Sequence, residues 1–364
     1  MGVPIRLRES DMNHVPSDSN QMLPKSAAGL VPVLFGHAAF QHLNASCELG
    51  LHELLHDHPG LTLEEIGDQL GLRKRCAGIL LLGTTALNLT RRTDNRYENS
   101  STIEDLFSNC SWSIFRDLVQ FEASIAYLSH SDYVDSLKRG TNAGIRWFPG
   151  TEPDLYRRLR NSPRLMNLFY RGMSSWSRVS NSILSQSSWF DGCSHVLDVG
   201  GGDGVNAIAL ALAFPSLAVT VLDLEEAIEI ARQRAEDAGL ANRVCAIVGD
   251  IFESAYPHNC DCVLLANQIP IWSPDDNLRL ISRAYEALPA GGRLVIFNEF
   301  INDSLDGPLY AALDNVYFAT LPTPYSQLYP SCDCVGWAHA AGFREAKWFP
   351  GHSWTPHGAV VAQR

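Results

Sequence analysis

The second half of the chain alternates between short apolar runs and amphipathic segments. Runs of strand length are found in HVLDVGGGDG, AVTVLDL, VCAIVGDIF, CVLLAN and GGRLVIFNEF. Helical spacing of apolar residues is found in VNAIALALAFP, EEAIEIARQRAEDAGL and DDNLRLISRAYEAL, and later near GPLYAALDNVYFATL and CDCVGWAHAAGF, before closing strands in KWFPG and GAVVAQ. This alternation predicts an α/β fold with a doubly wound, Rossmann-like parallel sheet. Right-handed crossovers place the carboxyl ends of the parallel strands at one edge, where a ligand should bind.

The first part of the chain has a different pattern, of three helical segments and a hairpin. Thr62 and Glu65 form a capping-box signature before the second helix, and Asp94-Asn95 marks the hairpin turn. The order predicts a mostly α-helical, winged-helix domain at residues 27–110. Basic residues at the start of the third helix leave DNA binding open as an alternative. Because the rest of that helix is apolar and the chain is acidic, we favour packing against another subunit.

The remaining boundaries follow from composition. Residues 1–26 are polar and are expected to be flexible. Residues 111–187 are helical and aromatic-rich, with an interruption near Pro163, and are expected to form a linker or lid over a substrate. Residues 188–364 form the expected catalytic domain.

Bulk composition narrows the function classes. Of 364 residues, 46% are apolar and 19% are charged, which indicates a globular protein, and the net charge of −12 argues against nucleic acid as a partner. No apolar run is long enough to cross a membrane, and no secretory segment is visible at the N-terminus. We therefore expect a cytoplasmic protein whose nine cysteines are reduced. The pairs Cys260/Cys262 and Cys332/Cys334 could hold zinc, but C-x-C spacing is too short for a usual structural site, so no metal is expected.

The strongest local signal is the glycine turn VLDVGGGDGVN, residues 196–206. Its glycines allow a tight turn close to a ligand, and it follows a strand and precedes a helix. Asp223, about 20 residues on at the end of the next strand, can accept hydrogen bonds from two ribose hydroxyls. Together these features predict a nucleoside ligand.

Two nucleoside cofactors are candidates for this turn, NAD and S-adenosylmethionine. The third glycine of a dinucleotide site would fall on Val205. Asp198 and Asp203 suit a ligand with a cationic amine and no pyrophosphate, and Asp250 and Phe252 in GDIF suit adenine. We therefore predict S-adenosylmethionine as the cofactor, released as S-adenosylhomocysteine.

The chain resembles the class I S-adenosylmethionine-dependent O-methyltransferases of the caffeate and hydroxyindole type, found in plants and in bacterial natural-product pathways. The resemblance rests on VLDVGGGDG, VLDL, GDIF, CVLLANQIPIW with SPDDN, EALPAGGRLVIF and FYRGMSSWS, and it runs from about residue 28 to the end. It implies a homodimer formed through the N-terminal domain, whose helices lend residues to the partner's pocket.

The resemblance also assigns site residues. It implies contacts with the cofactor for ten positions: Ser177, Gly200, Gly202, Asp203, Asp223, Leu224, Asp250, Phe252, Asn267 and Trp272. Met173 matches a methionine that lines the substrate pocket. Aromatic and polar residues elsewhere complete the substrate positions that we expect: Phe169, Trp176, Phe300, Asn302 and Tyr317, with Tyr325 as a weaker candidate.

The sequence departs from the family at its catalytic turn. The family typically has N-x-L-H-D-W, in which the histidine takes a proton from the substrate hydroxyl, whereas here Pro270 stands at the histidine position and Ile271 at the acid. The region that usually supplies a glutamate reads LPTPYSQLYPSCD. Prolines in both places, at 270 and 322, also argue against the iron site of related C-methyltransferases.

A missing base restricts the acceptor. The sulfonium methyl is already activated, so alignment can supply much of the rate for a nucleophile that need not lose a proton first. We therefore predict methyl transfer to nitrogen, carbon or an acidic group of a small, largely apolar specialised metabolite. One alternative uses the bound sulfonium as a fixed charge for a pericyclic, decarboxylation or hydroxylation reaction. Another is a partner that binds the nucleoside without catalysis.

Substitutes for the base are limited. His37 and His42 lie on an N-terminal helix that could reach a partner's pocket, and Glu299 follows the fifth strand at the ligand edge. His339, His352 and His357 are expected to be surface or capping residues.

Overall fold

The computed structural model describes residues 25–351 and 355–364, and the segment 1–26 predicted to be flexible lies almost wholly outside them, as does His352. The chain divides into two compact units, Met1–Thr102 and Ile103–Arg364. The second unit holds both the helical segment of residues 111–187 and the large sheet. In the described part, no helix combines the length and the apolar character needed to cross a bilayer.

The first unit has the predicted winged-helix order. Its elements are η2 (Lys25–Leu30), α1 (Val31–Leu34), α2 (Gly36–Glu48), α3 (Leu51–Asp57), β1 (Leu61–Thr62), α4 (Leu63–Gln69), α5 (Lys74–Ala86), β2 (Thr90–Thr93) and β3 (Arg96–Asn99). The strands form a sheet in the order β1-β3-β2. Thr62 and Glu65 make the predicted capping box, and Asp94 adopts φ +54° at the hairpin turn.

Helices precede the sheet of the second unit. They are α6 (Ser101–Ser108), which begins in the first unit, α7 (Trp112–Phe121), the π-helix η3 (Glu122–Ala126), α8 (Tyr127–His130), α9 (Tyr133–Arg139), η4 (Ala143–Trp147), α10 (Leu155–Leu159), α11 (Pro163–Ser185) and η5 (Ser188–Phe190). Pro163 opens α11, where its missing N–H costs nothing because the first helical N–H groups have no intrahelical acceptor. The predicted interruption of the amphipathic pattern is thus the break between α10 and α11.

The sheet has seven strands in the order β6-β5-β4-β7-β8-β10-β9. The strands are β4 (His195–Val199), β5 (Ala218–Asp223), β6 (Val244–Val248), β7 (Cys262–Ala266), β8 (Arg293–Glu299), β9 (Glu345–Pro350) and β10 (His357–Gln363). The intervening elements are α12 (Val205–Ala213), α13 (Glu225–Asp237), η6 (Ile269–Ile271), α14 (Pro274–Ala287), α15 (Leu309–Thr320) and α16 (Ser331–Ala340). The first five strands are parallel, and β10 is antiparallel to both β8 and β9. The predicted doubly wound fold is confirmed.

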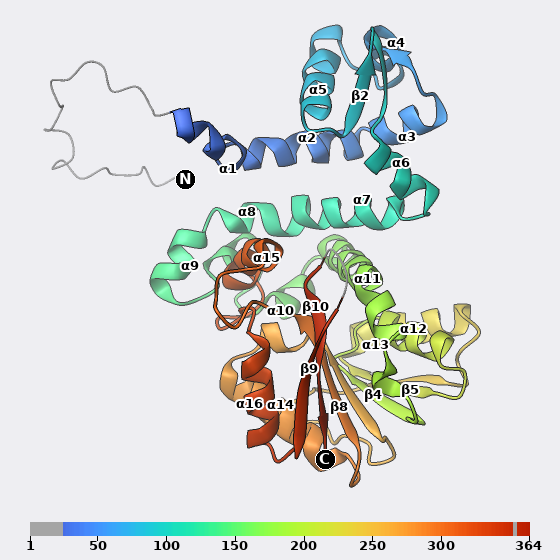
Figure 1. Ribbon diagram of the computed structural model, residues 1–364, viewed down its shortest axis with the longest axis vertical. Coiled ribbons are helices and arrows are strands. Elements are labelled where there is room, and N and C mark those ends of the chain that lie inside the picture. The colour runs from blue at the N-terminus through green and yellow to red at the C-terminus, as the bar shows by residue number, and fades with distance from the viewer. Residues whose placement is uncertain (1–24, 352–354) are drawn as a thin grey trace, which may run out of the picture. The chain divides into compact units, whose positions relative to one another are not determined.

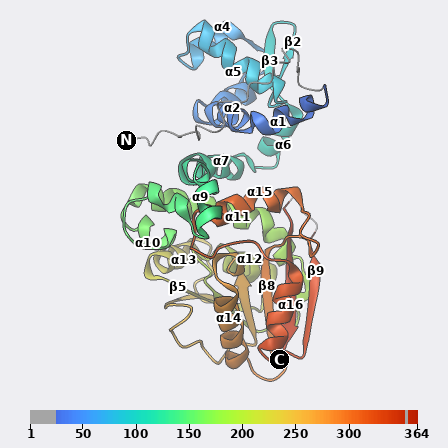
Figure 2. The same ribbon diagram turned by 90° about the vertical axis from the view of Figure 1, so that its left-hand side faces the viewer.

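Two apolar layers bury the sheet. Side chains of α14 and α16 pack on one face, and side chains of α11, α12 and α13 pack on the other. Figures 1 and 2 show these helices flanking the strands. The strand order reverses between β4 and β7. From β4 the chain continues outward through β5 and β6, and it then returns to β7 on the other side of β4 and continues to β8. In open α/β sheets the ligand binds at this switch point, outside the carboxyl ends of the strands.

Candidate functional site

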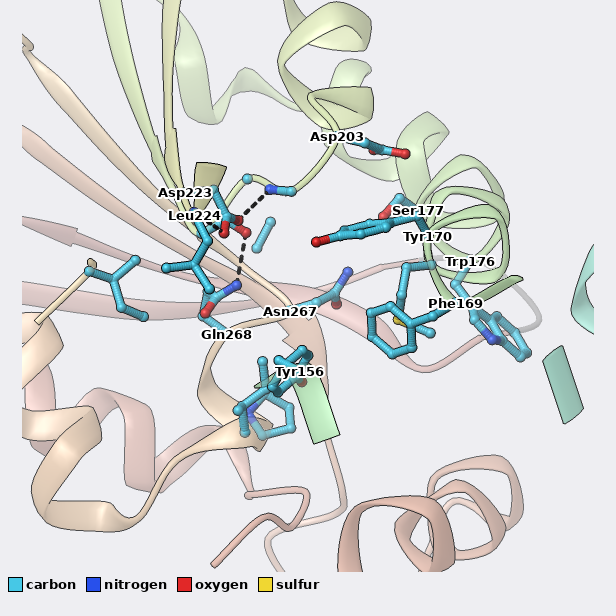
Figure 3. A pocket seen from close by; sticks show the side chains of 18 of the residues that line it. Tyr156, Phe169, Tyr170, Trp176, Ser177, Asp203, Asp223, Leu224, Asn267 and Gln268 are labelled. Atoms are coloured by element: carbon cyan, nitrogen blue, oxygen red, sulfur yellow. Dashed lines mark hydrogen bonds between the residues drawn. The ribbon is translucent and has the colours of Figure 1, made fainter. Parts of the chain in front are cut away.

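A cavity of about 570 Å³ opens at the carboxyl edge of the parallel strands in the second unit. Its walls come from the turns after β4, β5, β6 and β7, from the end of β8, and from α10, α11 and α15. Figure 3 shows Tyr156, Phe169 and Trp176 on one side of it and Asp223 and Leu224 on the other. The site is thus polar where the glycine turn lies and aromatic opposite.

The glycine turn has the conformation that its sequence requires. Gly200, Gly202 and Gly204 have φ of +69°, +59° and +77°, a region that residues with a Cβ seldom occupy. A Cβ on Gly200 would lie 2.3 Å from the amide of Gln268, whereas a Cβ on Gly202 would meet no atom within 4 Å. Gly200 and Gly202 both line the cavity. Gly202 therefore leaves open space for a ligand against its backbone.

Asp223 holds this turn in place. Its Oδ2 accepts a hydrogen bond from the Gly202 N–H at 2.8 Å, and its Oδ1 accepts one from the Leu224 N–H at 2.6 Å (Figure 3). Burial raises the pKa of Asp223, although the two backbone donors oppose that rise. The carboxylate therefore combines a structural role with a position on the cavity wall, where a ribose would lie.

The other predicted cofactor residues of the strand turns also line the cavity. Asp203 forms an ion pair with Arg234 at 2.5 Å, and Asp250 accepts a hydrogen bond from the Phe252 N–H at 2.8 Å. The Phe252 ring meets Trp272 edge-on, with 4.9 Å between ring centroids. The structure thus brings together all ten predicted cofactor residues, because Ser177, Leu224 and Asn267 line the same cavity.

Asp198 lies behind the turn and outside the cavity lining. It is fully buried, and neither carboxylate oxygen has a hydrogen-bond partner. A Cβ on Gly201 would lie 2.5 Å from its Oδ2. Burial and the charge of Asp223 raise the pKa of Asp198 from 3.8 to about 7.

This raised pKa predicts a pH-dependent effect of Asp198→Asn. Between pH 3.8 and about 7 the folded protein keeps a proton that the unfolded chain loses, so stability falls as pH rises. The amide cannot ionise, so the variant should gain about 1–3 kcal/mol over the wild type at pH 8 and little at pH 4. Urea unfolding of the cofactor-free protein at both pH values measures this. An equal difference at the two values would contradict the assignment.

The turn after β7 is anchored by its neighbours and carries no titratable side chain. The Gln268 amide donates to the Gly200 carbonyl at 2.9 Å, which ties this turn to the glycine turn. The hydroxyls of Thr323 and Ser326 donate to the Ile271 carbonyl at 2.6 and 2.8 Å. The segment that lacks the family's glutamate therefore has a structural role, since it holds the backbone beside Pro270.

Placement of the predicted substrate residues is mixed. Phe169, Met173, Trp176 and Tyr317 line the cavity. Phe300, in contrast, lies in the core, 4% exposed and in ring contact with Trp348. Asn302 and Tyr325 are also absent from the lining; Asn302 hydrogen-bonds Asp306 within its own loop, and Tyr325 is 65% exposed.

Of the described histidines singled out from the sequence, one, His357, departs from the expectation. His37 and His42 lie on α2 of the first unit, and the His42 ring packs against Gly83. His339 bonds the Phe343 carbonyl, away from the cavity. The expectation for His357 was wrong: it is 3% exposed, lines the cavity, and its Nε2 lies 3.2 Å from Asn267 Oδ1. Burial lowers the pKa of His357 to about 3, so its ring is neutral.

Sequence reasoning missed other members of the cavity wall. Tyr156, Tyr170, Gln268 and Asp314 all line it, with Glu299 beside them as predicted. Burial is the main cause that raises the pKa of the Tyr156 and Tyr170 hydroxyls, so both stay protonated. Within the described residues, no three or more His, Cys, Asp or Glu side chains gather as metal ligands would.

Comparison with known proteins places this site in a family. Residues 132–343 match the family model of an O-methyltransferase domain, and residues 31–109 match that of an O-methyltransferase dimerisation domain. An L-tyrosine C(3)-methyltransferase of Streptomyces lavendulae is 41% identical over 94% of each chain. A 3-hydroxy-5-methyl-1-naphthoate 3-O-methyltransferase of Streptomyces sahachiroi is 28% identical over 84% of this chain and 86% of its own.

A solved structure supports the same assignment over nearly the whole molecule. The apo form of the S-adenosylmethionine-dependent methyltransferase SibL is 53% identical, with a TM-score of 0.82, and the match covers 93% of this chain and 99% of SibL. The domain order, the glycine turn with Asp223 and these similarities agree. The chain belongs to the family of S-adenosylmethionine-dependent O-methyltransferases.

Proposed function

We propose that this S-adenosylmethionine-dependent methyltransferase transfers the methyl group to a ring carbon of a phenolic metabolite. The supporting observation is the turn at Pro270, which has a proline where the family has its catalytic histidine. Membership of the family does not decide which atom accepts the methyl group, because one relative is named as a C-methyltransferase and another as an O-methyltransferase. The name of the relative with 41% identity specifies methyl transfer to carbon 3 of L-tyrosine.

The chemistry explains why carbon fits a site that lacks the family's catalytic histidine. A phenol has a pKa near 10 and is mostly protonated at pH 7, so rapid methylation of its oxygen needs proton removal first. A ring carbon next to the hydroxyl attacks with its π electrons. The C–C bond would form as the C–S bond breaks, with S-adenosylhomocysteine as the leaving group, and the cationic ring would then release its proton to solvent and regain its aromaticity. Alignment of ring and sulfonium supplies the rate.

The chain's own residues hold the two reactants. Asp223 and the glycine turn would hold the nucleoside, with Asp250 and Phe252 at the adenine. S-adenosylmethionine supplies an electrophilic methyl group when bound. The apolar wall of Phe169, Met173 and Tyr317 would orient the acceptor ring and exclude water.

The test is product analysis with S-adenosylmethionine labelled with ¹³C at its methyl group. L-Tyrosine and simple para-substituted phenols serve as acceptors, and carbon NMR separates an aryl methyl group from a methoxy group. The proposal predicts an aryl methyl group and one S-adenosylhomocysteine per product. A methoxy product would contradict it, and a product without S-adenosylhomocysteine would favour the fixed-charge alternative.

We also propose that the protein is a homodimer formed through its first unit. That unit matches a dimerisation domain, and several of its large apolar side chains are exposed, including Leu30 (64%), Val33 (79%) and Leu34 (66%). A cluster of exposed large apolar side chains in one short segment is typical of a protein interface.

The dimer gives a prediction for the double variant Val33→Asp/Leu34→Asp. Two buried, unpaired carboxylates at the interface should shift the protein to monomers, because isolated charges are costly to bury. Light scattering after size-exclusion chromatography measures the mass, with Gln69→Asp on α4 as the control. A dimeric double variant, or a monomeric wild type, would contradict the proposal.

Finally, we propose that the enzyme works in the cytoplasm. None of the nine cysteines, all of them in the described residues, is in a disulfide, as expected in a reducing compartment.

A further inference from the structure

Two acidic side chains lie at the acceptor end of the cavity. Glu299 is the last residue of β8, Asp314 lies within α15, and both line the cavity wall. The glycine turn follows β4, and β7 lies between β4 and β8. Neighbouring strands lie about 4.8 Å apart, so Glu299 lies about 10 Å across the sheet from the cofactor turn. This pair therefore belongs to the acceptor rather than to the cofactor.

The two carboxyl groups lie within hydrogen-bonding reach of each other. Glu299 donates a hydrogen bond to Asp314, and Tyr310 also contacts Glu299. Burial raises the pKa of Asp314 to about 6, and burial together with the charge of Asp314 raises the pKa of Glu299 further. Burial, with the charge of Asp314, also raises the pKa of Glu122 in η3 to about 7. At neutral pH this corner is acidic, with Asp314 mainly ionised.

No cation of the described chain neutralises this corner. The two arginines that line the cavity are paired with other acids, Arg157 with Asp154 at 3.4 Å and Arg160 with Glu226 at 2.8 Å. Oε2 of Glu299 is buried and has no hydrogen-bond partner. The described residues also form no group that could hold a metal ion. A buried carboxylate without a neutralising cation is costly, so the cation that completes this corner should come with a ligand.

We propose that Glu299 and Asp314 bind the primary ammonium group of the acceptor substrate, which makes the substrate an aromatic amine or amino acid. This inference rests on the proposed ring methylation. An ammonium group carries three N–H donors, which can form charge-assisted hydrogen bonds with the unpartnered Oε2 of Glu299 and with the Asp314 carboxylate. A relative named for L-tyrosine methylation acts on a molecule with such a group.

The neighbouring surface fits the rest of such a molecule. On α15, Asp314 lies four residues after Tyr310 and three residues before Tyr317, so the three side chains share one face of the helix. Tyr317 contacts Phe121 edge-on at 5.6 Å, and Phe121 lies against Phe169 with ring centroids 6.1 Å apart. An aromatic wall therefore adjoins the acidic pair, as a phenol ring joined to an ammonium group requires.

The experiment compares two probes that differ in one group. Tyramine carries an ammonium group where 4-propylphenol carries a methyl group, and calorimetry measures the binding of each to protein loaded with S-adenosylhomocysteine. We expect the wild type to bind tyramine more tightly. Glu299→Gln and Asp314→Asn should each weaken the binding of tyramine by about 10- to 100-fold, the effect of losing a hydrogen bond to a charged group. The same variants should change the affinity for 4-propylphenol by less than about threefold.

Controls separate this role from folding and from chemistry. Both variants should bind S-adenosylhomocysteine like the wild type, and Asp314→Glu, which keeps the charge, should retain part of the tyramine affinity. The proposal would be overturned if the wild type bound the two probes equally or bound neither of them. It would also be overturned if the variants weakened the binding of both probes to the same extent. Tyramine that binds as expected in a protein that methylates no ring carbon would instead contradict the proposed function and leave the ammonium site standing.

Discussion

A valine at Gly202 is expected to abolish cofactor binding while the protein stays folded. The Cβ of residue 202 would point into open space, and Gly202 lines the cavity, so the two methyl groups of valine would occupy the volume proposed for the nucleoside. Steric exclusion of a ligand from a preformed site can remove binding altogether. A saturating dose of S-adenosylhomocysteine, about 100 times its Kd, should stabilise the wild type by about 2.7 kcal/mol and the variant not at all.

The matched control is Gly239→Val. Gly239 has φ of +68° and open space around a Cβ, as Gly202 does, but it follows α13 and does not line the cavity. In both variants a β-branched residue must adopt a left-handed backbone conformation, which costs about 1–3 kcal/mol. The free energy of unfolding of a domain is usually about 5–15 kcal/mol, so both variants should still fold. Thermal unfolding with and without ligand should therefore show a ligand shift for Gly239→Val and none for Gly202→Val. A normal shift in both would refute the position proposed for the cofactor.

The variant Pro270→His is expected to add methyl transfer to the phenolic oxygen. Pro270 lines the cavity in the first turn after β7, and its carbonyl accepts the Gln327 N–H at 2.9 Å, a bond that the substitution can keep. An imidazole there could remove the hydroxyl proton, and general-base help is worth about 10²–10⁴-fold. The methoxy product from a phenol should therefore rise by about 10²-fold, while the aryl methyl product changes less.

Pro270→Ala serves as the control for added space. It widens the cavity without a base, so it should leave the methoxy product near the wild-type level. An equal rise of the methoxy product in both variants would mean that the shape of the cavity, and not the lack of a base, prevents the wild type from methylating oxygen. A pH profile supplies a second readout, because only the histidine variant should gain methoxy product as pH rises through the imidazole pKa.

The glycine turn and the strand ends were accessible to sequence reasoning because their signals are local. Gly200, Gly202 and Asp223 follow apolar runs at fixed spacing, and parallel strands deliver such residues to one edge. Phe300 shows the limit of that rule. Successive residues of a strand point to opposite faces, so with Glu299 on the cavity wall the next side chain turns into the core, where it meets Trp348.

Residues whose placement depends on distant pairing were missed. His357 reads locally as part of a turn-rich loop, yet it begins β10, which inserts antiparallel between β8 and β9 and sets His357 opposite Glu299. Asp314 carries no motif, and only the packing of α15 against the cavity gives it a role. Such long-range pairings are set by the whole fold, so short sequence patterns do not contain them.

Every chemical inference depends on a cofactor at the glycine turn, and calorimetric titration of S-adenosylmethionine and S-adenosylhomocysteine into the wild-type protein measures whether it binds. We expect one site per chain for both compounds, with Kd values in the range typical of enzyme KM values, about 1 μM to 1 mM. No detectable binding of either compound to the folded protein would contradict this expectation.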